Sequence, residues 1–199
     1  MNAVKVHFDK VSAGYSSLSG RGLWRILRRR EARTVAALLP AITDSTTALD
    51  LGSGSGFYSD LLRQENVRDL TCVDFSEKML AKIENPDYLK IRADIEEYRS
   101  NKNYDIILCA GALEFSKEPL KVFVNVASML KNGGSFILLY PTKNFLGRLY
   151  QLYHRQHGFS VTLYEDRKLL SFSTQAGLRL ISHSYLFPFT GVVKYTCEK

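Results

Sequence analysis

Short apolar runs alternate with helix-like segments through the middle of the chain. The apolar runs, such as GSFILLY at 134–140, are typical of strands buried on both faces of a parallel sheet. Between them, apolar residues recur every three to four positions, which indicates helices. We predict strands at 46–51, 69–75, 88–94, 104–110 and 134–140, and helices at 57–64, 76–83 and 119–134. This alternation predicts right-handed βαβ units, with helices on both faces of a parallel sheet.

The end of the chain breaks this alternation. Two strand-like runs, 178–187 and 191–198, are separated by only three residues. A connection this short permits an antiparallel hairpin and excludes another crossover helix. The predicted fold class is therefore α/β: a Rossmann-like, doubly wound, mostly parallel sheet of seven strands with a C-terminal antiparallel hairpin.

Composition limits the class of protein. A chain of 199 residues, with 45% hydrophobic and 24% charged residues, suits one globular domain, 1–199. No apolar run approaches the roughly 18 residues that would span a bilayer, and the first residues lack the apolar core of a signal peptide. The three cysteines form no CxxC pair. We therefore predict neither a metal site nor disulfides, and we expect a cytoplasmic protein.

Positive charge is concentrated at one end of the chain. The net charge is +7, and residues 1–40 hold eight Lys or Arg against two Asp or Glu. Such a field attracts nucleic acid, an anionic membrane surface or an acidic small molecule, and a solvated helix face is the alternative explanation. We expect residues 1–45 to form a helical lid segment on an α/β core at 46–199. Peripheral contact of Arg28, Arg29 and Arg30 with an anionic membrane is an addition to that role.

Three glycines stand where the first predicted strand gives way to the next helix. Gly52, Gly54 and Gly56 would let the backbone turn sharply and approach a ligand at the carboxyl edge of the sheet. Neither register of these glycines fits the dinucleotide pattern G-x-G-x-x-G, and no lysine follows them as a Walker loop requires. Asp50 would repel a pyrophosphate and attract an ammonium or sulfonium group. The loop therefore indicates a cationic ligand without phosphates.

Two further acids end the next two predicted strands. Asp74, 24 residues after Asp50, is placed to accept both hydroxyls of a ribose. Helix capping is its alternative role, but Ser76 is already a suitable cap. Asp94 is placed to bind an exocyclic amine such as that of adenine, or to cap the segment that follows it. A ribose, an adenine and a positive charge without phosphates describe S-adenosylmethionine.

Five segments match, in order, the motifs of one family. They are DLGSGSG (50–56), CVDFS (72–76), RADIEE (92–97), YDIILCAGALEF (104–115) and LKNGGSFILLYP (130–141). By these segments the chain resembles the class I S-adenosylmethionine-dependent methyltransferases, which release S-adenosylhomocysteine. The resemblance implies that the three glycines line the methionine part of the cofactor and that Asp74 takes the ribose hydroxyls.

The resemblance assigns the remaining cofactor contacts as well. Phe75 and Met79 would pack near the adenine, and Ala110 would offer its carbonyl to the amino group. FDKVSAGYSS (8–17) resembles a segment of small-molecule methyltransferases of ubiquinone and menaquinone biosynthesis, which implies that Tyr15 lies over the cofactor near the methyl group. The full set of expected cofactor-binding residues is Tyr15, Asp50, Gly52, Gly54, Gly56, Asp74, Phe75, Met79, Asp94, Ile95 and Ala110.

The expected reaction is in-line transfer of a methyl group to a small, hydrophobic or acidic metabolite. A base is needed only if the acceptor must lose a proton. His154 and His157 are candidates for that base, and Tyr15 is a third catalytic candidate. Both histidines lie in 141–168, an insertion expected to shape the acceptor pocket. An ordinary amphipathic helix with its histidines facing solvent is the alternative.

Two other functions stay open. One is an RNA methyltransferase, which the basic N-terminal segment favours, and the other is a non-catalytic S-adenosylmethionine-binding protein. CAGALEF (109–115) lacks the Asn/Asp-Pro-Pro-aromatic run of adenine-N6 enzymes, so nucleic acid is not the partner that we favour. Within this segment, Cys109 is expected in the core, and Glu114 faces the acceptor, the methionine end of the cofactor, or solvent.

Overall fold

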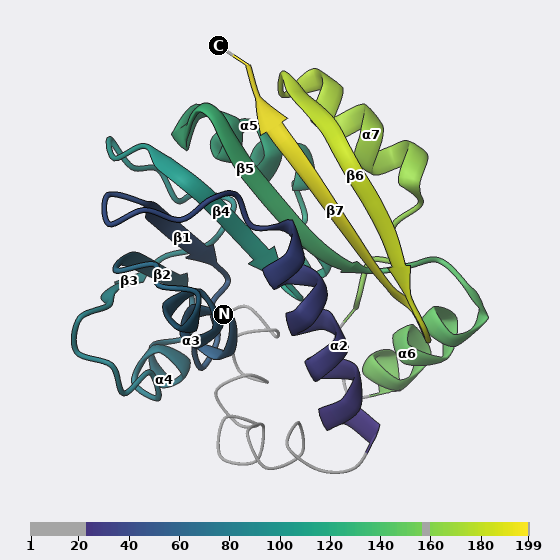
Figure 1. The fold of residues 1–199 in the computed structure, drawn as a ribbon. Helices are drawn as coiled ribbons and strands as arrows, with labels where there is room; N and C mark the ends of the chain where they lie inside the picture. Colours follow the sequence, from purple (N-terminus) through teal and green to yellow (C-terminus); the bar gives the residue numbers. More distant parts are fainter. Residues whose placement is uncertain (1–22, 157–159, 199) are drawn as a thin grey trace.

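Seven strands form one sheet in the order β3-β2-β1-β4-β5-β7-β6 (Figure 1). The structure is a computed structural model that describes residues 23–156 and 160–198. The strands are β1 Thr47–Leu51, β2 Asp69–Asp74, β3 Leu89–Arg92, β4 Tyr104–Ala110, β5 Leu130–Pro141, β6 Leu178–Leu186 and β7 Thr190–Cys197. The helices are α2 Leu23–Leu38, α3 Phe57–Gln64, α4 Glu77–Leu80, α5 Pro119–Met129, α6 Phe145–Gln156 and α7 Asp166–Gln175, and a 3-10 turn, η1, covers Leu113–Phe115.

The pairing of the strands confirms the predicted fold class. β1 to β5 pair in parallel, whereas β7 pairs antiparallel with both β5 and β6. The chain runs from β1 outward through β2 to β3, and then returns to place β4 on the other side of β1. The connections that follow β1 and β4 therefore leave in opposite directions. Such a reversal leaves a crevice at the carboxyl edge of a parallel sheet.

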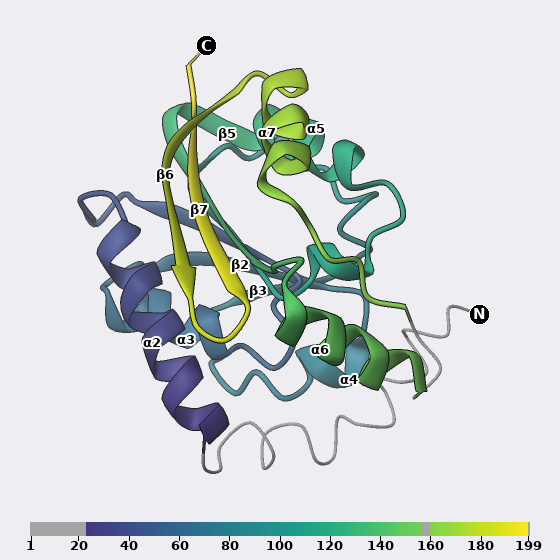
Figure 2. The same ribbon diagram turned by 90° about the vertical axis from the view of Figure 1, so that its right-hand side faces the viewer.

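Helices cover both faces of this sheet, and Figure 2 shows the layers from the side. α5 and α7 lie on one face, where Phe123 of α5 packs edge-on against Phe136 of β5 and Tyr195 of β7. α2 and α3 lie on the other face, where the fully buried Val35 and Leu62 belong to a second core cluster. The central strands are thus covered on both sides, which explains their continuous apolar runs.

The helix predicted at 119–134 is wrong at its end. α5 stops at Met129, and Leu130 already has extended backbone angles. Leu130 pairs with Tyr104 of β4, after which the register of the two strands shifts. The chain then turns at Gly133, where φ is +73°. Pairing with a neighbouring strand therefore overrides the helical periodicity, and the glycines shape the start of β5 instead of ending a helix.

α4 is also shorter than the helix predicted at 76–83. It covers only Glu77–Leu80, and the Ser76 side chain caps it by accepting a hydrogen bond from the Met79 N–H. After Leu80 the bonds join residues three apart, since the Lys82 N–H donates to the Met79 carbonyl and the Ile83 N–H to the Leu80 carbonyl, so tight turns replace the α-helix.

One carboxylate joins α2 to two parts of the core. Glu31 accepts hydrogen bonds from the Tyr58 hydroxyl of α3 (3.3 Å) and from the Thr190 hydroxyl of β7 (2.7 Å). Lys194 of β7 donates to the Leu38 carbonyl at the end of the helix (2.7 Å). α2 is therefore fixed to both α3 and β7. Among the described helices, α2 included, none is long and apolar enough to cross a membrane.

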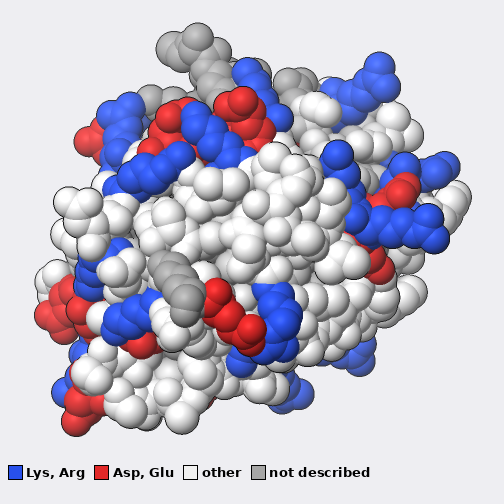
Figure 3. Space-filling model, turned by 90° about the horizontal axis from the view of Figure 1, so that it is seen from above, with Lys and Arg blue, Asp and Glu red and all other residues white. Residues whose placement is uncertain are grey.

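Ion pairs lie at the edge of the sheet where the parallel strands begin. Lys102 pairs with Asp69 of β2, and Lys131 of β5 pairs with Asp105 of β4. Figure 3, seen from above Figure 1, shows basic and acidic side chains next to one another around an uncharged centre. On this face, which lies opposite the carboxyl ends of the parallel strands, charges of both signs are therefore interspersed.

Candidate functional site

A cavity lies where the strand order reverses, at the carboxyl ends of β1, β2 and β4. It measures about 1130 Å³ including its open mouth. The loops that follow β1 to β4 form its walls, together with α2 and α3. Eight of the residues predicted to bind the cofactor line it: Gly52, Gly54, Asp74, Phe75, Met79, Asp94, Ile95 and Ala110.

The glycine loop after β1 is tied to the end of β2. The N–H groups of Gly52 and Ser53 both donate to the Val73 carbonyl (2.7 and 2.9 Å). Gly52 has φ +80°, and a Cβ built on it would lie 2.3 Å from the Ala112 Cβ, so the loop needs glycine there. Gly54 has φ +53°, and no atom lies within 4 Å of the position of its missing Cβ. The loop therefore leaves open space at its middle glycine.

The Asp74 carboxylate fixes the shape of this loop from the end of β2. Its Oδ2 accepts a hydrogen bond from the Gly54 N–H (2.9 Å), and its Oδ1 accepts one from the Ser76 N–H (2.8 Å). The side chain is 6% exposed and borders the cavity. Since a carboxylate has about four acceptor positions, Asp74 keeps acceptor capacity for a ligand.

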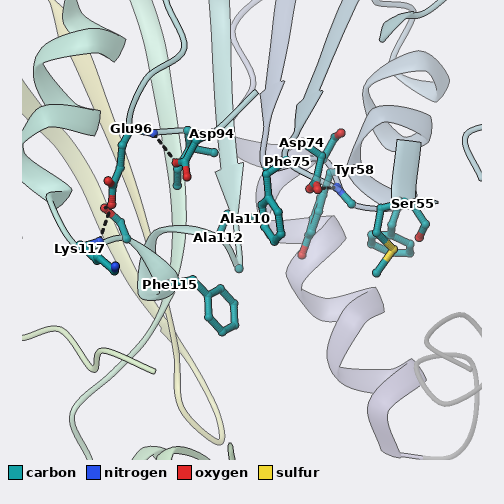
Figure 4. Close-up of a pocket in the computed structure, with 18 of the residues that line it drawn as sticks. Ser55, Tyr58, Asp74, Phe75, Asp94, Glu96, Ala110, Ala112, Phe115 and Lys117 are labelled. Atoms are coloured by element: carbon teal, nitrogen blue, oxygen red, sulfur yellow. Dashed lines mark hydrogen bonds between the residues drawn. The ribbon is translucent and has the colours of Figure 1, made fainter. Parts of the chain in front are cut away.

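An apolar ring separates Asp74 from Asp94 in the cavity. Figure 4 shows Asp74 and Asp94 on opposite sides of the Phe75 ring. The buried side chains of Met79 and Ile95 also line the cavity. Asp94 does cap the segment after it, because its Oδ1 accepts from the Glu96 N–H (3.0 Å), and it borders the cavity as well.

Glu96 is a cavity residue that the sequence did not single out. Its Oε1 accepts hydrogen bonds from the Ser116 hydroxyl (2.8 Å), the Lys117 N–H and the Glu118 N–H (3.1 Å). Burial acts to raise the pKa of Glu96, but these hydrogen bonds and nearby Lys121 outweigh it and lower the pKa. Glu96 therefore joins the loop after β3 to the loop after β4 (Figure 4).

α2 and α3 close the cavity with residues that the sequence also missed. Phe57 and Tyr58 of α3 line it, as does Arg28 of α2. The Arg28 guanidinium lies 4.8 Å from the centre of the Phe57 ring, within range of a cation–π contact. Arg28 thus faces the cavity, whereas Arg29 and Arg30 are exposed.

Two predicted cofactor residues do not line the cavity. Gly56, with φ +88°, begins α3, and a Cβ there would meet Ile83 at 3.0 Å. Asp50 is buried at the end of β1, where its Oδ2 accepts from the Ser59 hydroxyl (2.6 Å). Burial raises the pKa of Asp50 to about 7, against the opposing effect of the Ser59 hydrogen bond, and Asp74 adds to the rise.

The candidate catalytic residues are not brought together at this cavity. Tyr15 and His157 lie outside the described residues. His154 lies on α6 with its ring centre 4.3 Å from that of Tyr150, and it does not line the cavity. Cys109 is fully buried, as predicted, and burial raises the pKa of its thiol. Glu114 is only 4% exposed, so the interpretation that it faces solvent is wrong.

The groups around the cavity fit S-adenosylmethionine. Asp74 and Asp94 supply acceptors for hydroxyl and amine groups, and Phe75 supplies an apolar ring between them. The Ser53 hydroxyl is buried in the glycine loop and has no hydrogen-bond partner within 23–156 and 160–198, so it is available to a ligand. A buried polar group of this kind requires a partner.

Comparison with known proteins agrees with this assignment. Residues 49–138 match the family described as a methyltransferase domain. Together with the sheet order and the cavity, this match makes residues 49–138 similar to a class I S-adenosylmethionine-dependent methyltransferase domain, and the groups around the cavity fit S-adenosylmethionine as the cofactor.

Individual relatives are distant. The ubiquinone biosynthesis O-methyltransferase of Coxiella burnetii is 25% identical over 149 residues, which cover 67% of this chain and 63% of that protein. The chain thus matches less than two thirds of the length of this curated relative. The magnesium protoporphyrin IX methyltransferase of Synechocystis PCC 6803, solved with S-adenosylhomocysteine, has the same fold with a TM-score of 0.77 at 17% identity, over 98% of both chains. A Haloferax volcanii methyltransferase, solved with its Trm112 activator, gives a TM-score of 0.82 at 17% identity, over 99% of this chain and 98% of that one.

Proposed function

We propose that this protein transfers a methyl group from S-adenosylmethionine to a small, hydrophobic or acidic molecule. The observation that carries the proposal is the joint arrangement of the glycine loop and Asp74 at the point where the strand order reverses. The cofactor supplies an activated methyl group on a sulfonium. The task of the protein is then to hold the cofactor and the acceptor in line, which is the main source of rate in such a transfer.

The cavity residues divide this task by their chemistry. Asp74 binds the ribose hydroxyls, while Phe75, Met79 and Ile95 contact the adenine. Asp94 accepts a hydrogen bond from the adenine amine. Arg28, which faces the cavity from α2, compensates the carboxylate of the methionine part. Asp50 acts from beneath the loop, where a cationic ligand favours its ionised form.

The segment 141–168 supports a small-molecule acceptor. It contributes α6, which carries Tyr150 and Tyr153 next to His154. Aromatic and basic side chains on this segment suit a flat or anionic acceptor. The two named small-molecule enzymes among the relatives point the same way, and we retain Tyr15, His154 and His157 as candidate catalytic residues. An RNA acceptor is the alternative.

Label transfer tests the proposal. Purified protein is incubated with methyl-labelled S-adenosylmethionine and cell extract, which is then separated into lipid, small-molecule, RNA and protein fractions. We expect label in the lipid or small-molecule fraction, and its loss in Asp74→Ala. Asp69→Ala is the matched control, because Asp69 begins the same strand at the opposite edge and is half exposed in its pair with Lys102.

The outcomes distinguish a small-molecule acceptor from the alternatives. Label in the RNA fraction would show that RNA, and not a small molecule, accepts the methyl group. Binding of S-adenosylhomocysteine without label in any fraction would favour a non-catalytic binding protein. Absence of both label and binding would refute the proposal.

Membrane contact is a second, separate proposal. Arg29 and Arg30 are exposed on α2 beside Ile26, which is 51% exposed. Cosedimentation with anionic vesicles tests it, and we expect weaker binding in the double variant Arg29→Gln, Arg30→Gln. Failure of the unmodified protein to bind at low salt would refute it.

A further inference from the structure

A buried carboxyl group lies against the wall of the cofactor cavity. Glu114 belongs to η1, which follows β4 directly, and it is 4% exposed. Its Oε1 is 3.8 Å from the position that a Cβ on Gly111 would take. Gly111 and Phe115, which flank it in the sequence, both line the cavity. The carboxyl group is therefore next to the cofactor site without belonging to the cofactor contacts proposed above.

The chain after α6 covers Glu114 from the other side. The Thr162 N–H donates to the Glu114 carbonyl (2.9 Å), and the Tyr164 hydroxyl donates to the Leu113 carbonyl (3.1 Å). Both bonds use the backbone of η1 and not the carboxyl group. Glu114 thus lies between the cofactor cavity and the segment that is expected to shape the acceptor pocket.

One oxygen of this carboxyl group is unsatisfied. Within residues 23–156 and 160–198, Glu114 Oε2 is buried and has no hydrogen-bond partner. A buried oxygen that accepts no hydrogen bond destabilises the fold. We therefore expect a bound ligand to donate a hydrogen bond to Glu114 Oε2. Because the segment 160–164 on this side belongs to the insertion that we expect to shape the acceptor pocket, we assign this oxygen to the molecule that accepts the methyl group.

The surroundings of Glu114 favour its neutral form. The groups that interact with it electrostatically are Glu31 of α2, Cys109 of β4 and Tyr164, and among the described residues none of these is a cation. Burial raises the pKa of Glu114 to about 7, and Glu31 contributes to the rise. A carboxyl group with this pKa can take up a proton near neutral pH, as a general base requires.

We infer that Glu114 is the base that receives the proton of the acceptor, and that the acceptor is a neutral molecule with an O–H or N–H group. The inference rests on the proposed function. The acceptor's lone pair forms the bond to the methyl carbon, the carbon–sulfur bond breaks with its electron pair going to sulfur, and the proton passes to Glu114 Oε2. An acceptor with a carboxylate at its reacting end would be repelled by Glu114, which narrows the acceptor class to hydroxyl or amine compounds.

The test compares four forms of the full chain. They are the unmodified protein, Glu114→Gln, Glu114→Asp and the control Glu97→Gln, whose side chain is 67% exposed in its pair with Lys121. Rates of label transfer to the small-molecule fraction of cell extract are measured from acid to alkaline pH. Calorimetry gives the affinity for S-adenosylhomocysteine, and infrared difference spectra give the protonation state of the carboxyl group without any acceptor.

The expected result is specific to a base. Glu114→Gln lowers the rate about 100-fold or more and removes its rise through neutral pH, because loss of a general base costs about 10²–10⁴ in rate. The affinity for S-adenosylhomocysteine stays close to the unmodified value, Glu114→Asp restores part of the rate, and Glu97→Gln changes nothing. The difference spectrum between the unmodified protein and Glu114→Gln shows a carboxylic acid band that disappears with a midpoint at pH about 7.

Two results would refute the role of Glu114 as a base while leaving the proposed methyl transfer intact. One is a Glu114→Gln rate close to that of the unmodified protein, and the other is a lower rate with an unchanged pH profile. If the unmodified protein binds S-adenosylhomocysteine but transfers no label, the proposed function itself fails, and the role of Glu114 fails with it.

Discussion

Replacement of Asp50 by asparagine is expected to change how stability depends on pH. Asp50 is fully buried, and its pKa rises from 3.8 to about 7 on folding. Because the folded-state pKa lies above the unfolded-state pKa, the unfolded chain loses this proton first as pH rises. The carboxyl group therefore lowers the free energy of unfolding between pH about 4 and pH about 7, and asparagine cannot do so.

The size of the effect follows from the two pKa values. By linkage, the raised pKa of Asp50 lowers the free energy of unfolding by about 1.5 kcal/mol at pH 5 and by about 4 kcal/mol at pH 8. From pH 5 to pH 8, the free energy of unfolding of Asp50→Asn should therefore rise by about 2.5 kcal/mol relative to that of the unmodified protein. This change with pH does not depend on any constant loss of packing in the variant. For a chain of this size, that gain corresponds to a shift in Tm of about 5–10 °C.

Thermal unfolding of both proteins across this pH range, followed by circular dichroism, is the assay. Asp105→Asn is the control. Burial acts to raise the pKa of Asp105, but hydrogen bonds from Lys131 and Thr47 outweigh it and lower the pKa. Asp105 is therefore ionised in both states over the range, and its variant should differ from the unmodified protein by a constant amount. A constant difference for Asp50→Asn as well would refute the reasoning.

Three further changes have expected outcomes. Gly52→Ala should cost about 1–3 kcal/mol and weaken S-adenosylhomocysteine binding, because its Cβ would lie 2.3 Å from the Ala112 Cβ at φ +80°. Gly191→Ala should lower Tm, since its Cβ would lie 2.3 Å from Cζ of the buried Tyr140 ring. Glu31→Ala should speed hydrogen exchange in α2 but not in the central strands, because it removes the bonds of α2 to α3 and β7.

Gly52→Ala has a control within the chain, and each of the three changes has an outcome that would contradict it. Gly177 has φ +74° and no atom within 4 Å of its Cβ position, so Gly177→Ala measures backbone strain without a clash. A loss of stability no larger for Gly52→Ala than for Gly177→Ala would show that the contact with Ala112 does not matter. Gly191 has no positive φ, so an unchanged Tm in Gly191→Ala would by itself show that the contact with Tyr140 does not matter. Uniform exchange across the molecule in Glu31→Ala would show that Glu31 does not hold α2 locally.

The strands themselves were predictable because each of them follows from local pattern. β1, β2 and β4 are apolar runs whose periodicity and length do not depend on distant residues, and the short hairpin connection restricts the topology. The first residues of β5 were not predictable, because Leu130 is extended through its pairing with Tyr104. In that case the partner, and not the local sequence, selects the backbone conformation.

The site was predictable only where its residues end strands. Gly52, Asp74 and Asp94 belong to loops that a parallel sheet must bring to one edge. Arg28 and Glu96 reach the cavity through the packing of α2 and through bonds to the loop after β4, which no local pattern contains. The positions of Tyr15 and His157, the cytoplasmic location and the organisation as one domain stay predictions.

The place of β7 in the sheet has a consequence for how the chain is made. β7 is the last described strand in the sequence, yet it lies between β5 and β6. Ser135 of β5 must find Thr196 of β7, a closure that spans a long stretch of chain and is therefore slow. During translation, β5 presents an open edge and β6 has no place in the sheet until residues 190–197 have been synthesised. That interval is when nascent chains are most exposed to wrong strand pairing, so chaperone capture should be strongest just before β7 is complete.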